Sequence, residues 1–193
     1  MADHPTREPA PGELRLVQEF VNTRDAESGD DRLASPEGLA AWLGEQTLPG
    51  AAGPLGASDV TAAVQLREAL RAILRTNSGA PSDPAATALI NQASERAPLR
   101  LHVDPGGGAH LEGAADGRAG VDPALARILA AVYAGMAEGS WARLKVCADE
   151  QCEWSFYDRS RNHSGQWCDM AVCGCRHKVR AYRARLAPGH TPA

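Results

Sequence analysis

Apolar residues recur three or four positions apart along most of the chain, which is the spacing of one face of an α-helix. Residues 13–25 show it first, with Leu16 and Phe20 four positions apart and other apolar residues beside them. The same spacing returns at intervals up to the C-terminal part. The helices predicted in this way span residues 13–25, 35–44, 58–76, 83–96, 122–138 and 170–186.

Residue pairs typical of helix starts support several of these helices. Ser35 followed by Pro36 suits an N-cap and a first helical position. Ser58 is the expected cap of the helix over residues 58–76, and Asp83 followed by Pro84 is expected to start the next one.

Strand patterns are few. Residues 99–103 alternate apolar and polar positions, residues 105–108 read as a turn, and residues 109–112 are the expected hairpin partner. A short strand over residues 143–146 is expected to lead into Cys147. The predicted fold is therefore mainly α with a small β-hairpin.

The composition of the 193 residues, 44% of them hydrophobic, is typical of a globular protein. The longest apolar run, residues 128–137, contains Gly135 and is shorter than the roughly 18 residues of a membrane span. The N-terminus is polar and Pro-rich and has no signal-peptide core. We expect a cytoplasmic protein that does not enter membranes, with residues 1–12 and 188–193 disordered.

The net charge of −4 is unevenly distributed. Residues 1–140 carry 11 Lys and Arg against 19 Asp and Glu, a net of −8, whereas residues 141–193 carry 9 against 5, a net of +4. A basic end on an acidic body suggests contact with nucleic acid or docking between the two parts. Chance clustering of cations on a solvated helix is the alternative.

All five cysteines lie near the C-terminus. Four of them form two pairs with four intervening residues each, Cys147 with Cys152 and Cys168 with Cys173. Paired cysteines of this kind in a reducing compartment predict one tetrahedral four-thiolate zinc ion, which is structural because no coordination position stays open. An iron–sulfur cluster and ordinary reduced cysteines are the alternatives. Cys175 falls on the apolar stripe of the last helix and is expected in the core. The alternative is that Cys175 binds the zinc ion in place of Cys173.

The last predicted helix carries cations on its other faces. With two arginines of the preceding loop, they form a predicted nucleic-acid-binding set. Its members are Arg159, Arg161, Arg176, Lys178, Arg180 and Arg183. Cations also stabilise the C-terminal turn of a helix, which is the structural alternative for Arg183.

The C-terminal segment resembles the CGNR zinc finger from residue 147 to about residue 185. The resemblance rests on the four paired cysteines, on Trp154, Phe156, Asp158 and residues 160–162, and on the motif CGCR at residues 173–176. Cys175 stands where the family has Asn, and residues 163–166 read HSGQ where the family is usually rich in Arg. The resemblance implies a small treble-clef-like zinc finger over residues 141–187.

The preceding part resembles the ABATE domain, found in bacterial proteins labelled stress-induced transcription regulators. The matching features are FVNT at residues 20–23, Trp42, LREALR at residues 66–71 and Asn91. The resemblance implies a helical domain over residues 13–140 that senses a ligand or binds a partner upstream of a DNA-contacting finger.

Four polar side chains on otherwise apolar helices are candidates for binding a small molecule, with an arginine pairing an anion. They are Asn22, Thr23, Arg67 and Arg71. The structural alternative is that the first two end a helix and that the arginines are solvated.

The expected function is that of a transcriptional regulator, with DNA, a small-molecule effector and a second copy of the chain as partners. The alternative is a protein–protein adaptor whose zinc site only folds the C-terminus against the larger domain. The sequence has no nucleophile motif, phosphate loop or metal-hydrolase His/Glu pair, so we expect no enzymatic activity.

Overall fold

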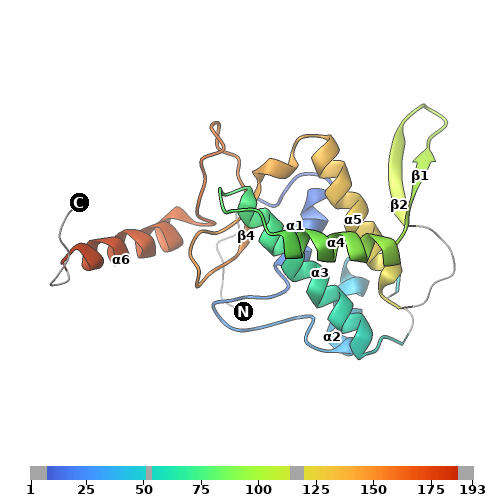
Figure 1. The fold of residues 1–193 in the computed structure, drawn as a ribbon, viewed down its shortest axis with the longest axis horizontal. Coiled ribbons are helices and arrows are strands. Elements are labelled where there is room, and N and C mark those ends of the chain that lie inside the picture. Colours follow the sequence, from blue (N-terminus) through green and yellow to red (C-terminus); the bar gives the residue numbers. More distant parts are fainter. Residues whose placement is uncertain (1–7, 51–53, 114–119, 187–193) are drawn as a thin grey trace.

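The computed structural model describes residues 8–50, 54–113 and 120–186. The N-terminal part is built from five helices in the described ranges, which surround a single apolar core (Figure 1). Their bounds lie within a few residues of the predicted ones. They are α1 (Leu14–Val21), α2 (Pro36–Glu45), α3 (Ala57–Thr76), α4 (Pro84–Arg96) and α5 (Asp122–Ala137).

The helices α1, α3 and α5 form the centre of the core. The apolar face of α1 is fully buried, and Phe20 packs against Trp42 of α2 with ring centroids 5.3 Å apart. Gly135 lets α5 approach α1, because a Cβ at this position would lie 2.4 Å from Cδ2 of Leu14. The glycine that interrupts the longest apolar run is therefore a packing position.

The helix starts agree with prediction in two cases and differ in one. The Ser35 hydroxyl accepts a hydrogen bond from the Gly38 N–H (3.1 Å), and the Asp83 carboxylate accepts one from the Ala86 N–H (3.0 Å). The expectation for Ser58 was wrong. The helix begins at Ala57, and the carboxylate of Asp59 accepts a hydrogen bond from the N–H of the N-cap Gly56, which Ser58 cannot do from inside the helix.

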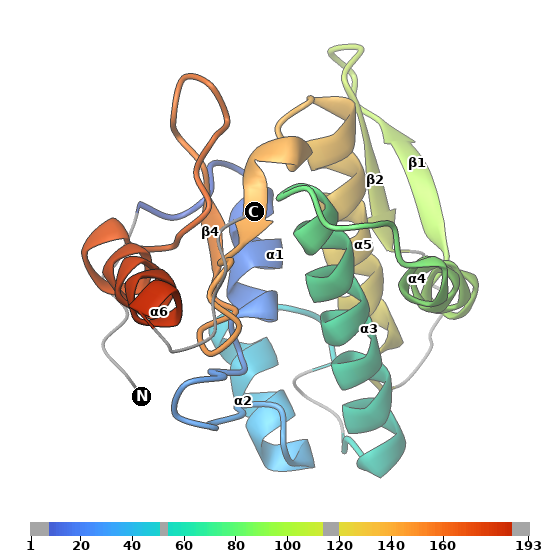
Figure 2. The same cartoon turned by 60° about the vertical axis from the view of Figure 1, so that its left-hand side comes forward.

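The predicted hairpin is confirmed as β1 (Leu99–Val103) and β2 (Ala109–Gly113), paired antiparallel with Leu101 opposite Leu111. It lies beside α5 at the edge of the helical body (Figure 2).

The C-terminal module starts with a 3-10 turn (Trp141–Arg143) and a second antiparallel hairpin, β3 (Leu144–Val146) and β4 (Ser155–Tyr157). A long loop then leads to a π-helical turn, η2 (Met170–Gly174), and to α6 (Cys175–Leu186). Both views show α6 standing away from the helical body (Figures 1 and 2). None of its residues is buried.

The base of this module belongs to the core of the larger domain. Trp141, Leu144 and Tyr157 are part of the same apolar cluster as α1 and α5. At the end of α3, the side-chain amide of Asn77 donates to the carbonyls of Trp141 (2.9 Å) and Leu144 (2.8 Å). The hairpin β3–β4 is thus fixed to the helical domain before the metal site begins.

The predicted disordered ends fall mostly outside the described residues, since residues 1–7 and 187–193 are not among them. Ala10, within the predicted N-terminal end, is buried and donates its N–H to Gln18 (2.6 Å). Among the helices of the described ranges, none has the length and apolar character needed to cross a membrane.

Candidate metal centre

The four predicted ligands converge beside the hairpin β3–β4. Cys147 follows β3, Cys152 lies in the turn before β4, Cys168 ends the long loop, and Cys173 lies in the turn η2. All four are buried, and their sulfur atoms lie within 4.8 Å of one another. The Sγ atom of Cys168 is 3.5 Å from that of Cys152 and 3.6 Å from that of Cys173.

These distances fit a tetrahedral zinc ion. A Zn–S bond of about 2.3 Å places the sulfurs of a four-thiolate site about 3.8 Å apart, whereas a disulfide needs about 2.05 Å. Hydrogen bonding to Cys147 raises the pKa of the Cys152 thiol. Hydrogen bonding to Cys147 and Cys152 raises the pKa of the Cys168 thiol. Four thiolates this close therefore need a divalent cation between them, and the closed donor set identifies a structural zinc site.

Backbone hydrogen bonds hold the ligands in position. The N–H of Cys147 donates to the carbonyl of Trp154 (2.9 Å), and that of Cys152 donates to the carbonyl of Asp149 (2.8 Å). The carboxylate of Asp169 caps the turn η2 by accepting from the N–H of Val172 (2.7 Å). The ligands are thus fixed by local turns, as expected for a small finger.

The expectation that Cys175 faces the core was wrong, because its side chain is exposed and lies outside the ligand cluster. A uniform α-helical period over residues 170–186 places Cys175 on the inner stripe. The π-helical turn over Met170–Gly174 holds an extra residue per turn. It directs Cys173 inward to the metal site and leaves Cys175 outside.

A buried ion pair organises the loop between β4 and Cys168. The Nζ of Lys145 donates to the Asp158 carboxylate (2.9 Å), and both side chains are almost fully buried. Burial alone raises the pKa of Asp158, but hydrogen bonds from Lys145, Ser160 and Gly165 outweigh it and hold this pKa far below its usual range. Asp158 is therefore an anchor of the loop, and its partner is Lys145.

Three of the six predicted DNA-contacting cations bind carboxylates of the protein itself. Arg176 pairs with Glu27 of the helical domain (3.0 Å), and Arg180 pairs with the buried Asp149 (2.8 Å). Arg159 pairs with Glu8 (2.9 Å). The other three, Arg161, Lys178 and Arg183, are exposed and form no ion pair within the described part of the chain.

Asn22 connects the helical domain to the finger. Its side-chain amide donates to the carbonyl of Ser155 (2.9 Å) and accepts from the N–H of the same residue (2.7 Å). Gln18 donates to that carbonyl as well (3.2 Å). Together they occupy the free edge of β4 in the way that a neighbouring strand would.

Arg67 and Thr23, two more of the predicted ligand-binding residues, contact each other inside the helical domain (3.2 Å). Arg67 is 1% exposed and forms two hydrogen bonds to the Asp31 carboxylate, at 2.6 and 2.8 Å. Burial lowers the pKa of this guanidinium, and the bonds to Asp31 more than offset that effect. Asp31 was not singled out in the sequence, which lacks a local signal for a partner 36 positions away.

Arg71, the fourth predicted ligand-binding residue, is equally buried and donates to the carbonyl of Val21 (2.5 Å). Two carboxylates lie near its guanidinium, that of Glu68 at 3.6 Å and that of Glu153 of the finger at 3.7 Å, and Glu153 also pairs with Arg75. Glu153 directly follows the ligand Cys152 and has a left-handed backbone with φ of 51°. No sequence pattern singled out Glu153, although its place beside a metal ligand was a usable signal.

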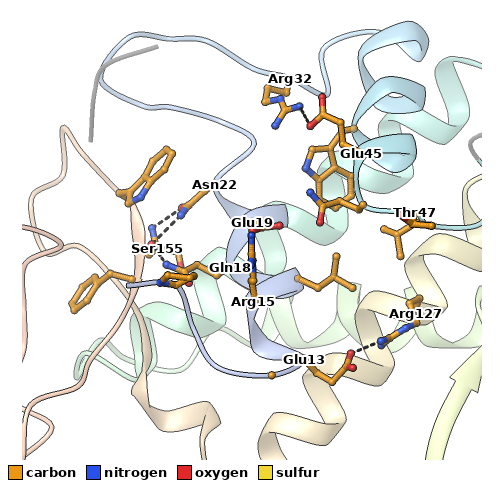
Figure 3. A pocket seen from close by; sticks show the side chains of 18 of the residues that line it. Glu13, Arg15, Gln18, Glu19, Asn22, Arg32, Glu45, Thr47, Arg127 and Ser155 are labelled. Carbon is orange, nitrogen blue, oxygen red and sulfur yellow. Dashed lines mark hydrogen bonds and ion pairs between the residues drawn. The ribbon is translucent and has the colours of Figure 1, made fainter. Parts of the chain in front are cut away.

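An open pocket of about 1150 Å³ lies where the two parts meet. It extends over the outer face of α1, the end of α2 and the start of β4 (Figure 3). Paired charges surround it, with Glu13 bound to Arg127 and Arg32 bound to Glu45 (2.5 Å). Asn22 is the one predicted ligand-binding residue among those that line it.

Comparison with known families agrees with this architecture. Residues 143–186 match the CGNR zinc finger. Residues 14–139 match the ABATE family, described as "Putative stress-induced transcription regulator". A search of curated proteins gives no match. The chain belongs to the ABATE family and ends in a CGNR zinc finger.

Proposed function

We propose that the protein is a transcriptional regulator that binds DNA through its zinc finger. The observation that carries the proposal is the composition of α6, a helix that stands clear of the body and whose charged residues are all cations. Lys178 and Arg183 on this helix, and Arg161 in the preceding loop, have no carboxylate partner among the described residues. Such cations are available for phosphate groups.

The zinc ion has a structural role in this proposal. Its four thiolate ligands leave no open position for a substrate, which favours action by binding over catalysis. Cys147, Cys152, Cys168 and Cys173 would hold the loop and the start of α6 in a fixed relation to the helical domain.

The affinity of a single chain for DNA is expected to be low. The three unpaired cations of the predicted set would add at most about three to the slope of log affinity against log salt, since each phosphate contact adds roughly 0.9. The net charge of −8 on residues 1–140 opposes the approach of DNA. A useful regulator of this design would need a second copy of the chain or contacts to bases.

The pocket beside α1 supports a sensing role for the helical domain. It is lined by Trp42 and Leu16 of that domain and also by Trp154 and Phe156 of the finger. A small molecule that touches both sides would change how firmly the finger is held. We propose this pocket as the effector site. Of the four predicted ligand-binding residues, Asn22 is the one that would contact the effector there.

The adaptor alternative is favoured by one specific observation. Arg159 and Arg176 pair with Glu8 and Glu27 of the N-terminal part and so dock the finger. Arg180 pairs with Asp149 within the finger, so half of the predicted DNA-binding set is engaged in ion pairs of the protein itself.

A salt series separates the two functions. The variant Arg161→Ala, Lys178→Ala and Arg183→Ala removes the three unpaired cations of the predicted set. The control variant Arg24→Ala, Arg96→Ala and Arg100→Ala removes the same charge from the helical domain, at exposed positions outside the pocket beside α1. If the protein is a regulator, only the first variant should bind DNA more weakly than the parent chain. The slope of its log affinity against log salt should also fall, by up to the contribution of about three phosphate contacts. Equal binding by both variants and the parent chain supports the adaptor.

A further inference from the structure

The helix α6 and the turn before it carry a stripe of exposed apolar residues, which we call the α6 seam. Its members are Val172, Cys175, Val179, Tyr182 and Leu186. The exposed fractions of Val179, Tyr182 and Leu186 are 47%, 59% and 65%. The positions follow each other at alternating spacings of three and four, which is the spacing by which one helix packs along another.

None of the described residues covers the seam. The helix is held near its start by the ion pairs of Arg176 with Glu27 and of Arg180 with Asp149, and its remaining length stands off the body (Figures 1 and 2). A shallow groove of about 600 Å³ lies along the seam beside Gln151. Val172, Cys175 and Val179 line it together with three arginines.

The charges beside the seam select its partner. If the seam residues are the a and d positions of a heptad, the flanking e and g positions are Arg176, Lys178, Arg183 and Arg185, which are all cations. Two copies of α6 packed along their seams would place these cations opposite one another, parallel or antiparallel, and like charges at these positions oppose pairing. The flanks therefore disfavour a second copy and favour a partner with carboxylates at the matching positions.

DNA accounts for the cations of α6 but not for the seam. Phosphate groups bind cations and gain nothing from valine, tyrosine or leucine side chains turned to solvent. Apolar residues at regular spacing between two rows of cations match instead an amphipathic helix with an apolar face and acidic flanks.

We propose that the α6 seam is the docking site for an acidic amphipathic helix of a partner protein. This proposal is independent of DNA binding by the finger, although both ligands would use Lys178 and Arg183. A partner helix and DNA would consequently compete for α6.

The test uses the full-length, zinc-loaded chain and a labelled synthetic helix of about three heptads, with Leu at a and d and Glu at e and g. A second peptide carries Lys in place of every Glu. The seam variant is Val179→Ser with Leu186→Ser, which should fold normally because both side chains are exposed. The matched control is Ala181→Ser with Ala184→Ser, on the opposite face of the same helix.

The expected result is binding of the Glu peptide and not of the Lys peptide. The seam variant should bind the Glu peptide at least about tenfold more weakly, and the control variant within about twofold of the parent. DNA affinity, measured separately, should be the same for the seam variant and the parent, which keeps this test distinct from that of DNA binding.

Three results would overturn the proposal. The first is that the Glu peptide fails to bind or binds no better than the Lys peptide. The second is that the seam variant loses affinity for DNA, which would place the seam against DNA. The third is self-association of the parent chain in sedimentation that the seam variant lacks, which would make a second copy the occupant.

Discussion

The carboxylate of Glu153, in the turn that holds the zinc ligands, lies 3.7 Å from the guanidinium of Arg71 in the core of the helical domain. Arg71 is 1% exposed, and two of its nitrogens have no hydrogen-bond partner. Burial accordingly lowers the pKa of Arg71, although Glu68 and Glu153 counteract the shift. The negative charge of Glu153, next to a zinc ligand, thus partly compensates the buried positive charge of Arg71 in the helical domain.

Replacement of Glu153 by glutamine is expected to destabilise the whole chain, because it leaves Arg71 with less compensation for its buried charge. Glu153 accepts a hydrogen bond from Arg75 and faces Arg71 without one, so the loss of its charge is expected to cost about 1–3 kcal/mol, the range for hydrogen bonds to charged groups. Glu153→Gln should lower the free energy of unfolding by that order in zinc-saturated chemical denaturation. Glu150→Gln is the matched control, since Glu150 is exposed and pairs with no described residue. Equal stability of both variants would contradict this role of Glu153.

Removal of zinc is expected to loosen α3 as well as the finger. A structural zinc ion supplies on the order of 10 kcal/mol of apparent folding free energy, and its loss frees the turn that holds Glu153 near Arg71 and Arg75. Hydrogen exchange after chelation should show lost protection at residues 147–154, between the two strands, and reduced protection at the C-terminal half of α3. Fluorescence of Trp154 and Trp167, which pack on the cysteines, should report the loss. Unchanged protection of α3 would show that the two parts are uncoupled.

Two glycine-to-alanine substitutions are expected to have opposite signs. At Gly135 the new Cβ would lie 2.4 Å from Leu14, so the strain of overpacking, about 1–3 kcal/mol, should exceed the gain in helix propensity. At Gly44, also inside a helix, the new Cβ meets nothing within 4 Å, so the substitution should stabilise by up to about 1 kcal/mol. Thermal unfolding of both variants checks the pair. Stabilisation by Gly135→Ala would mean that α1 and α5 can separate without cost.

Local patterns predicted the elements and the metal ligands. The helices and the hairpin β1–β2 follow from apolar spacing, and the zinc ligands follow from cysteine spacing, because each signal is contained in a few neighbouring residues. The strand β4 escaped prediction because its residues, SFY, do not alternate apolar and polar positions as those of β3 do. Its place also depends on Asn22, far away in the sequence.

The partners of charged residues could not be predicted in the same way. Arg67 and Arg71 were singled out as polar groups on an apolar helix, but their contacts with Asp31 and Glu153 join positions 36 or more apart. The orientation of Cys175 depends on a single π-helical turn, which apolar periodicity does not reveal. Sequence patterns show where a polar or charged side chain interrupts the apolar face of a helix. The residue that this side chain contacts depends on the tertiary fold.

The ion pair of Lys145 and Asp158 gives the last prediction, which concerns pH. Since the pKa of Asp158 is lowered in the folded protein, its contribution to stability is complete above the unfolded value of about 3.9 and is lost as the pH falls below it. Asp158→Asn leaves Lys145 buried without its counter-ion and should cost roughly 3 kcal/mol at neutral pH. The difference in unfolding free energy between parent and variant should therefore be constant from pH 7 to about 5 and shrink below about 4.

Comparing parent and variant at each pH in excess zinc cancels the loss of metal that acid causes in both chains. The double variant Lys145→Met with Asp158→Asn provides the control, because it removes the buried cation together with its partner. It should be more stable at neutral pH than Asp158→Asn alone, since an unpaired buried charge costs more than a neutral pair. A parent–variant difference that does not change between pH 7 and pH 3 would show that Asp158 holds the loop by shape and not by charge.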